Sequence, residues 1–113
     1  MIARELIWDA AAFGLTVAIE WPLFAWISGL GLRRVGLFCL LMNCASWFAM
    51  VGVQSQWDVP VPALEGGVIV AEAVIIAWFW SWRAGRALGA SLLLNLSSWL
   101  LGETLLSAIM ARI

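Results

Sequence analysis

Two glutamates and two asparagines lie inside apolar stretches of this sequence, where carboxyl and amide groups are unusual. Glu20 lies within "GLTVAIEWPLFAWISGLGL" (14–32) and Glu72 within "VIVAEAVIIAWFW" (68–80), and each is the one ionisable group of its stretch. Asn43 and Asn95 lie in two further apolar runs. A carboxyl group in such surroundings can exchange a proton or bind a cation, and an asparagine can both donate and accept hydrogen bonds.

These four residues belong to an internal repeat with a shift of 52 residues. Without any gap, nine of the 28 positions from 20 to 47 are identical to those from 72 to 99. The shared pattern is Glu-x5-Trp-x7-Arg-x8-Asn-x2-Ser-Trp. The two asparagines of the chain match each other, which chance in a leucine- and alanine-rich sequence rarely produces. We therefore predict a duplication, with one repeat at about 10–53 and the other at about 62–105.

The repeat also predicts the side chains that surround the polar groups. Each asparagine is followed three and four positions later by a serine and a tryptophan, a spacing that places all three on one face of a helix. A further tryptophan follows each glutamate by six positions. The supporting residues that this pattern indicates are Ser46, Trp47, Ser98, Trp99, Trp26 and Trp78.

The composition predicts that these residues are carried by membrane-spanning helices. Hydrophobic residues make up 65% of the 113 residues, against roughly 45–50% in soluble domains. A small soluble protein could not bury so much apolar surface. Four runs are long enough, or nearly so, to cross a bilayer as helices: Ala10 to Leu32, Val35 to Val53, Gly66 to Trp82 and Ala87 to Ile109.

We therefore expect an all-α integral membrane protein that forms a single domain over residues 1–113. Its four transmembrane helices would form two tandem helical hairpins. Each repeat contains two spans and so returns the chain to the same side of the membrane. The two hairpins then have the same orientation, and their pseudo-two-fold axis lies along the membrane normal, unlike the inverted repeats of many transporters.

The arginines predict the orientation in an inner or plasma membrane. Four of the six lie in the connectors 29–36 and 81–89, so the positive-inside rule places these turns in the cytoplasm. Both termini and the loop 54–67, in which Pro60 and Pro62 are expected to prevent helix formation, would lie outside. Arg4 and Arg112 count against this orientation.

Counting residues places the polar groups at one depth. Glu20 precedes Leu32, at the centre of the first turn, by 12 residues, and Asn43 follows it by 11. At a rise of 1.5 Å per residue both lie about 17 Å from that turn, close to the middle of a roughly 30 Å hydrocarbon core. Because Glu72 and Asn95 flank the second turn in the same way, we expect a Glu/Asn layer in which the carboxyls are protonated and hydrogen-bonded to the asparagines, directly or through one water.

Two further carboxyl groups fall nearer the outer face. Glu65 begins the third apolar run, and Glu103 lies far along the fourth. Glu65 precedes Glu72 by seven residues and so shares its helix face. The pair could form an outer access point for a proton or cation. Alternatively, these are solvated interfacial carboxylates or partners of Arg4 or Arg112.

The residue types that the chain lacks argue against metal, cofactor, nucleic-acid and enzyme functions. The chain has no histidine and no cluster of basic residues, so we expect no metal site, no cofactor and no nucleic-acid partner. Cys39 and Cys44 would face different directions on a helix, a poor geometry for a disulfide. No nucleophile lies beside a base, so an enzyme is the least favoured class.

Two functions remain open. The first is a transporter or oligomeric channel that moves protons or cations through the Glu/Asn layer. The second is a non-catalytic accessory or assembly subunit, in which Glu–Asn hydrogen bonds only hold the helices together. In either case the expected partners are the lipid bilayer and either further copies of the chain or a larger membrane complex. A tryptophan-lined groove for a lipid or pigment also stays open.

Overall fold

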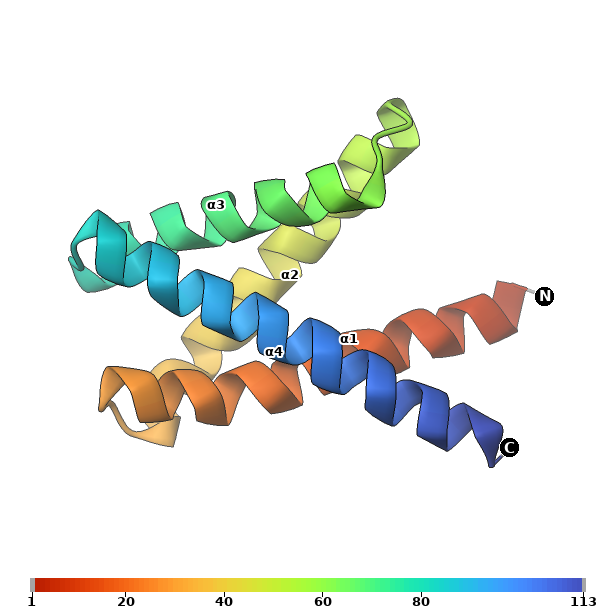
Figure 1. Cartoon of the computed structure of the whole chain (residues 1–113), viewed down its shortest axis with the longest axis horizontal. Coiled ribbons are helices and arrows are strands. Elements are labelled where there is room, and N and C mark those ends of the chain that lie inside the picture. Colours follow the sequence, from red (N-terminus) through yellow and green to blue (C-terminus); the bar gives the residue numbers. More distant parts are fainter. Residues whose placement is uncertain (1, 113) are drawn as a thin grey trace.

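The computed structural model describes the backbone of residues 2–112 and the side chains of residues 7–112. Four α-helices follow one another (Figure 1): α1 (Ile2–Ser28), α2 (Leu32–Gln56), α3 (Val61–Trp80) and α4 (Ala84–Ala111). All four are long and apolar enough to cross a membrane. The predicted helical architecture is thus confirmed.

The two connectors predicted to carry the arginines are shorter than expected. α2 begins at Leu32 and α4 at Ala84, so Arg33, Arg34 and Arg86 all lie within helices. Leucine, arginine and alanine favour helix formation and extend each helix to the edge of the turn. The first turn uses a left-handed residue at Gly29 (φ 72°), and in the second Ser81 (φ 56°) takes the same conformation.

The prediction that both prolines prevent helix formation is wrong for Pro62. α3 begins at Val61, so Pro62 lies in its first turn. A proline is tolerated there because the first N–H groups of a helix have no partner within it. Since α2 continues to Gln56, the loop between α2 and α3 contains only residues 57–60.

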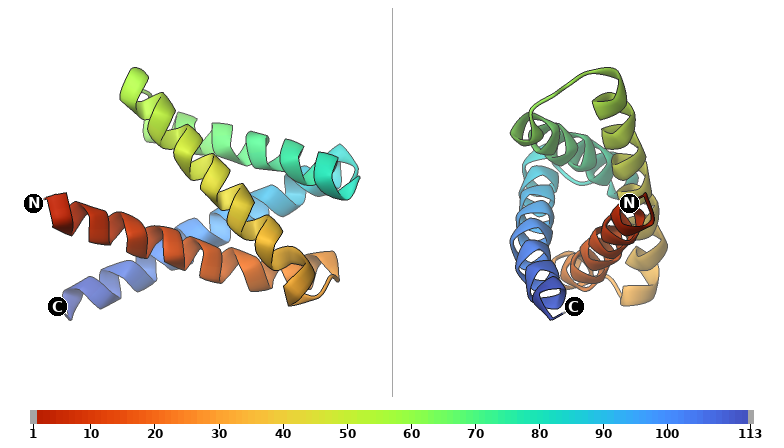
Figure 2. Two further views of the ribbon diagram at one scale, coloured as in Figure 1. Left: turned by 180° about the vertical axis from the view of Figure 1, so that it is seen from behind. Right: turned by 90° about the vertical axis from the view of Figure 1, so that its right-hand side faces the viewer.

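The helices form a ring in which each lies against the next, and α4 closes the ring against α1 (Figure 2, right). The contact between α2 and α3 is the least extensive of the four. We call the end with the two short turns the closed end. The opposite end, which has both termini and the α2–α3 loop, is the open end. Towards it the pair α2 and α3 diverges from the pair α1 and α4 (Figure 1).

The buried core lies towards the closed end. Phe24 packs against Trp82 with ring centroids 5.6 Å apart, and Phe38 packs against Phe79 at 4.7 Å. Cys39 is buried there with a free thiol, and Cys44 is also free, as expected from their spacing. The fully buried apolar residues of this core are Phe24, Val35, Cys39, Ile76, Ala87 and Leu94.

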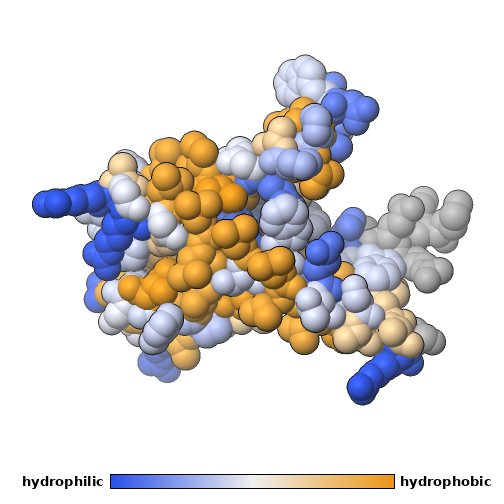
Figure 3. Space-filling model, viewed as in Figure 1, coloured by the Kyte–Doolittle hydropathy of each residue, from blue (hydrophilic) through white to orange (hydrophobic). Residues whose placement is uncertain are grey.

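The outer surface of the bundle is largely apolar. Figure 3 shows hydrophobic side chains spread over the middle of the molecule and hydrophilic ones at its ends. Trp26 and Trp78, which occupy equivalent repeat positions, are 78% and 81% exposed. Together with the many other exposed large apolar side chains, they form a more extensive apolar surface than soluble monomers usually expose, so this surface is suited to contact with lipid.

A close contact fixes the first hairpin. The indole N–H of Trp21 donates a hydrogen bond to the carbonyl of Leu32 at 2.6 Å. The same ring covers Gly36, where an added Cβ would lie 2.8 Å from the Trp21 Cζ2 atom. Glycine at position 36 therefore allows α1 and α2 to approach across the turn.

This contact predicts a specific cost for replacing Gly36. Gly36→Ala forces the Trp21 ring to move and should lower the free energy of unfolding by about 1–2 kcal/mol, because overpacking outweighs the gain in helix propensity. Gly52→Ala in the same helix meets nothing within 4 Å and serves as the control. Denaturation of both variants in detergent would measure the difference, and equal stabilities would contradict the close packing.

Candidate functional site

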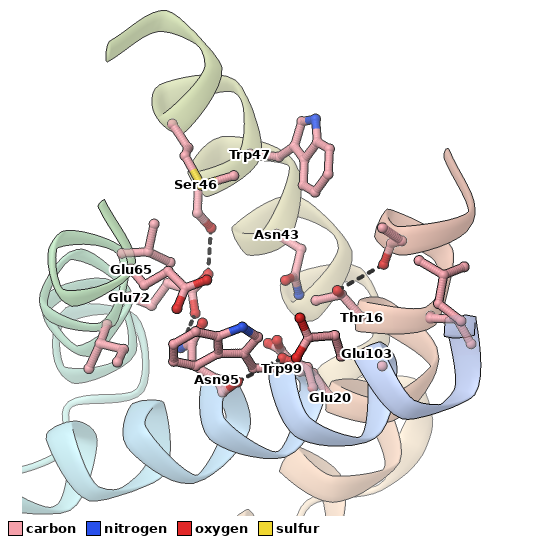
Figure 4. Close-up of a pocket in the computed structure, with 18 residues that line it drawn as sticks. Thr16, Glu20, Asn43, Ser46, Trp47, Glu65, Glu72, Asn95, Trp99 and Glu103 are labelled. Carbon is pink, nitrogen blue, oxygen red and sulfur yellow. Dashed lines mark hydrogen bonds between the residues drawn. The ribbon is translucent and has the colours of Figure 1, made fainter. Parts of the chain in front are cut away.

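A cavity of about 290 Å³ lies between the four helices, on the open-end side of the core (Figure 4). It reaches from the exposed Glu103 to the buried Glu20 and Glu72, which are each 1% exposed. The ionisable side chains that line it within residues 7–112 are all glutamates. The lining residues on which the site depends are Thr16, Glu20, Asn43, Ser46, Trp47, Glu65, Glu72, Asn95, Ser98, Trp99 and Glu103.

Glu72 is held by side chains from two other helices. Its Oε1 accepts a hydrogen bond from the Asn95 amide of α4 at 2.8 Å, and its Oε2 lies 2.5 Å from the Ser46 hydroxyl of α2. The Asn95 amide also donates to the carbonyl of Ser91, and the Ser91 hydroxyl bonds the backbone of α3. Glu72 thus approaches an asparagine as predicted, in a network that joins three helices.

The hydrogens in this network can be counted. Ser46 has one hydroxyl hydrogen, yet its oxygen lies 2.6 Å from the Met42 carbonyl as well as 2.5 Å from Glu72. One hydrogen can make a full-strength bond to only one of these two acceptors, or a weaker shared bond to both. Every contact is satisfied if Glu72 is protonated and donates to Ser46, while Ser46 donates to Met42 and Asn95 donates to the second carboxyl oxygen. The geometry therefore favours a neutral Glu72.

Glu20 has the equivalent repeat position but different surroundings. Among the described residues, neither of its carboxyl oxygens has a hydrogen-bond partner, although both are buried. Ser98 and Asn43 are the polar side chains near it. Ser98 donates its hydroxyl hydrogen to the Asn95 carbonyl at 3.2 Å. Asn43 donates one of its two amide hydrogens to the Cys39 carbonyl at 2.8 Å, and the other remains free for an acceptor. Glu20 thus lies beside Asn43, as predicted, but no direct hydrogen bond of ordinary geometry joins the two side chains.

The outer glutamates lie nearer the open end of the same cavity. Glu65 on α3 and Glu103 on α4 both line it, and Glu65 is half-buried while Glu103 is exposed. The structure thus brings the two predicted outer carboxyls together with the deeper pair. The alternative partner Arg4 has a side chain outside the described range.

Two of the four predicted supporting tryptophans line the cavity. Trp47 and Trp99 belong to its walls, and Trp47 is held by an edge-to-face contact with Phe13 at 5.8 Å. Trp26 and Trp78 point outwards and are not among the cavity residues. Both serines line the cavity as well.

Sequence reasoning missed Thr16, which lines the cavity and donates its own hydroxyl hydrogen to the Ala12 carbonyl. Thr16 precedes Glu20 by four residues, so helical spacing could have placed it on the same face. It has no polar counterpart in the second repeat, where position 68 is valine, and a search for repeated residues therefore passed over it.

No protein-family model, curated protein or solved structure matches the chain. Within the described residues, no group of three or more His, Cys, Asp or Glu side chains is arranged to hold a metal ion. The site is therefore a four-helix cavity with one hydrogen-bonded and one unpaired glutamate at its base. Its function has to be argued from that chemistry.

The network around Glu72 predicts different effects for two substitutions. Glu72→Gln can accept from Asn95 and donate to Ser46, so stability should stay within about 1 kcal/mol of the original chain. Glu72→Leu leaves these groups without their partner and should cost about 1–3 kcal/mol. Denaturation in detergent would measure both effects. Equal losses in the two variants would contradict the network.

Infrared spectroscopy can test the protonation of Glu72 directly. A protonated carboxyl has a C=O stretching band distinct from those of a carboxylate. We expect such a band at neutral pH. Glu72→Gln should remove the part that Glu72 contributes, and the double variant Glu20→Gln/Glu72→Gln should remove the contribution of both buried carboxyls. Asp58→Asn, in the exposed loop between α2 and α3, is the control and should leave the band in place. A spectrum without this band would show that Glu72 is charged.

Proposed function

We propose that this chain is a membrane protein that moves protons or cations by way of the cavity. The observation that carries the proposal is Glu20, whose carboxyl is buried at the base of the cavity with both oxygens unpaired. An unpaired polar group inside a bundle is costly, and ionisable groups within membrane spans usually serve transport or proton transfer. A proton or a cation would supply the missing partner.

The one-sided shape of the cavity favours a transporter over an open channel. Towards the open end the cavity reaches the exposed Glu103, and towards the closed end the aromatic core around Phe24 and Phe38 fills the bundle. An ion that reaches Glu20 from the open end therefore has no continuous path through the core. Passage requires a second conformation in which the closed end opens, as in alternating access.

The repeat supports a specific orientation and symmetry within this proposal. The two hairpins would be related by a pseudo-two-fold axis along the membrane normal, with the open end outside and the arginine-bearing closed end in the cytoplasm of an inner or plasma membrane. Arg86 stacks on Trp82 at 3.7 Å beside the second turn, an arrangement suited to a membrane interface. Trp26 and Trp78 would then lie in the lipid near that interface.

The accessory-subunit alternative is favoured by a different observation. Trp26 and Trp78 are the most exposed tryptophans of the bundle, and a partner membrane protein could cover them as well as lipid could. Under this alternative the chain co-purifies with its partner and moves nothing alone. A homo-oligomer would place copies of the chain on the same surface.

Flux through liposomes that contain only this chain is the test of the proposed function. We expect a proton or cation flux that Glu20→Gln abolishes, because the amide preserves the size of the side chain but cannot exchange a proton or carry a charge. Glu72→Gln should keep more flux than Glu20→Gln, because glutamine reproduces the hydrogen bonds of a neutral Glu72. Asp58→Asn, outside the cavity, is the control.

One result would count against transport, and another would count against the different roles of the two glutamates. The absence of flux from well-folded protein, together with a co-purified partner, would favour the accessory subunit. Equal loss of flux in Glu20→Gln and Glu72→Gln would show that the two carboxyls act alike, contrary to their different surroundings. Thermal denaturation of each variant would separate loss of transport from loss of fold.

Labelling of introduced cysteines tests the orientation. In a chain whose own cysteines are replaced by alanine, Arg34→Cys and Arg86→Cys should react with a membrane-impermeant reagent only from the cytoplasmic side. Asp58→Cys in the α2–α3 loop should react only from the other side. The reverse labelling pattern would show that the chain has the opposite orientation in the membrane.

A further inference from the structure

We propose that the cavity binds a monovalent organic cation with an apolar body, and that Glu20 pairs with its charge between Trp47 and Trp99. This inference rests on the proposed function and narrows its substrate class. It depends on three features of the cavity: the number of carboxyls free to pair with a cation, the residues of the walls, and the size of the space.

The deep part of the cavity offers one carboxyl for a cation. Glu72 is already satisfied by Ser46 and Asn95 and is neutral in the arrangement that uses each hydrogen once. Glu20 has two unpaired oxygens in the same cavity. A ligand with a single positive charge therefore matches the deep part of the cavity, whereas a second deep charge would have to break the Glu72 network. Glu65, which also has an unpaired buried oxygen among the described residues, lies nearer the open end.

The walls suit an organic cation better than a hydrated inorganic one. Indole rings attract cations through their faces, and Trp47 and Trp99 both line the cavity with Glu20. Much of the remaining wall is aliphatic and offers no hydrogen bonds to hydration water. The larger aliphatic residues are Leu15, Val68, Ile69 and Leu106. An alkyl or aryl group on the cation would fill this part of the cavity.

The size of the cavity agrees with this class of ligand. Its volume of about 290 Å³ lies near the lower limit of the roughly 300–1,000 Å³ of small-molecule sites. A proton or a bare metal ion would leave most of it empty. Glu65 and Glu103, nearer the open end, add negative potential along the path to Glu20, which raises the local concentration of cations.

Binding of benzyltrimethylammonium to the full chain in lipid nanodiscs, measured by calorimetry, tests the inference. Its uncharged isostere neopentylbenzene tests the need for charge, and tetramethylammonium tests the need for an apolar body. We expect benzyltrimethylammonium to bind most tightly of the three. Glu20→Gln should weaken its binding by about 10- to 100-fold, and more than Glu72→Gln does.

The tryptophans provide a matched pair of variants. Trp99→Leu should weaken binding by about threefold to thirtyfold through loss of the cation–π contact. Trp26→Leu removes an exposed tryptophan outside the cavity and should leave binding unchanged. Thermal denaturation of every variant verifies that the fold is intact, and a Trp47→Phe variant, which keeps an aromatic face, should lose less affinity than Trp47→Leu.

The outcomes separate this inference from the proposed function. If neopentylbenzene binds as tightly as benzyltrimethylammonium, or Glu20→Gln binds the cation unchanged, the inference is overturned. If no organic cation binds but a proton flux dependent on Glu20 persists, the inference fails while the proposed function stands. If neither binding nor flux is found in well-folded protein, both fail.

Discussion

A polar group inside an apolar bundle needs a partner within the bundle, and this constraint organises the cavity. Glu72 meets it through Ser46 on α2 and Asn95 on α4. These bonds connect three helices and fix the side of the cavity opposite Glu20. Because both asparagines also bond the carbonyl four residues before them, their side chains are anchored to their own helices. Glu20 lacks such a partner, because within residues 7–112 neither of its carboxyl oxygens is hydrogen-bonded. Its carboxyl is therefore the group at the base of the cavity that is free to bind.

The apolar runs of the sequence predicted the four helices. Helical spacing and the number of residues from each turn predicted most of the cavity lining. Apolar runs define the helices, and repeat spacing brings Asn43, Ser46 and Trp47 onto one face. Which glutamate is bonded could not be predicted in this way, because the repeat gives Glu20 and Glu72 equivalent positions. Their difference arises from the orientation of individual side chains such as Ser98, which depends on packing between helices. The outward position of Trp26 and Trp78, by contrast, follows from helical spacing, because six residues turn a side chain by about 240° from the inward-facing glutamates.

The ends of the helices were predicted less well for a local reason. Arginines and glycines near positions 33 and 85 indicated turns, but only three residues are needed to reverse the chain when Gly29 and Ser81 adopt left-handed conformations. The flanking residues then continue the helix. A shorter connector also draws the two helices of each hairpin together at the closed end, where the aromatic core excludes the space that the open end retains.

The contact of Trp21 with Leu32 and Gly36 has no counterpart in the second half, where the equivalent residues are Ala73, Ala84 and Leu88. The first hairpin is thereby clamped across its turn by a ring that the second hairpin lacks. α2 and α3, in turn, share the smallest contact of any neighbouring pair. A separation of neighbouring helices would therefore lose the least packing between α2 and α3. Despite their matching residue pattern, the two halves are therefore held at their turns by different means, and a movement of the bundle need not be symmetric.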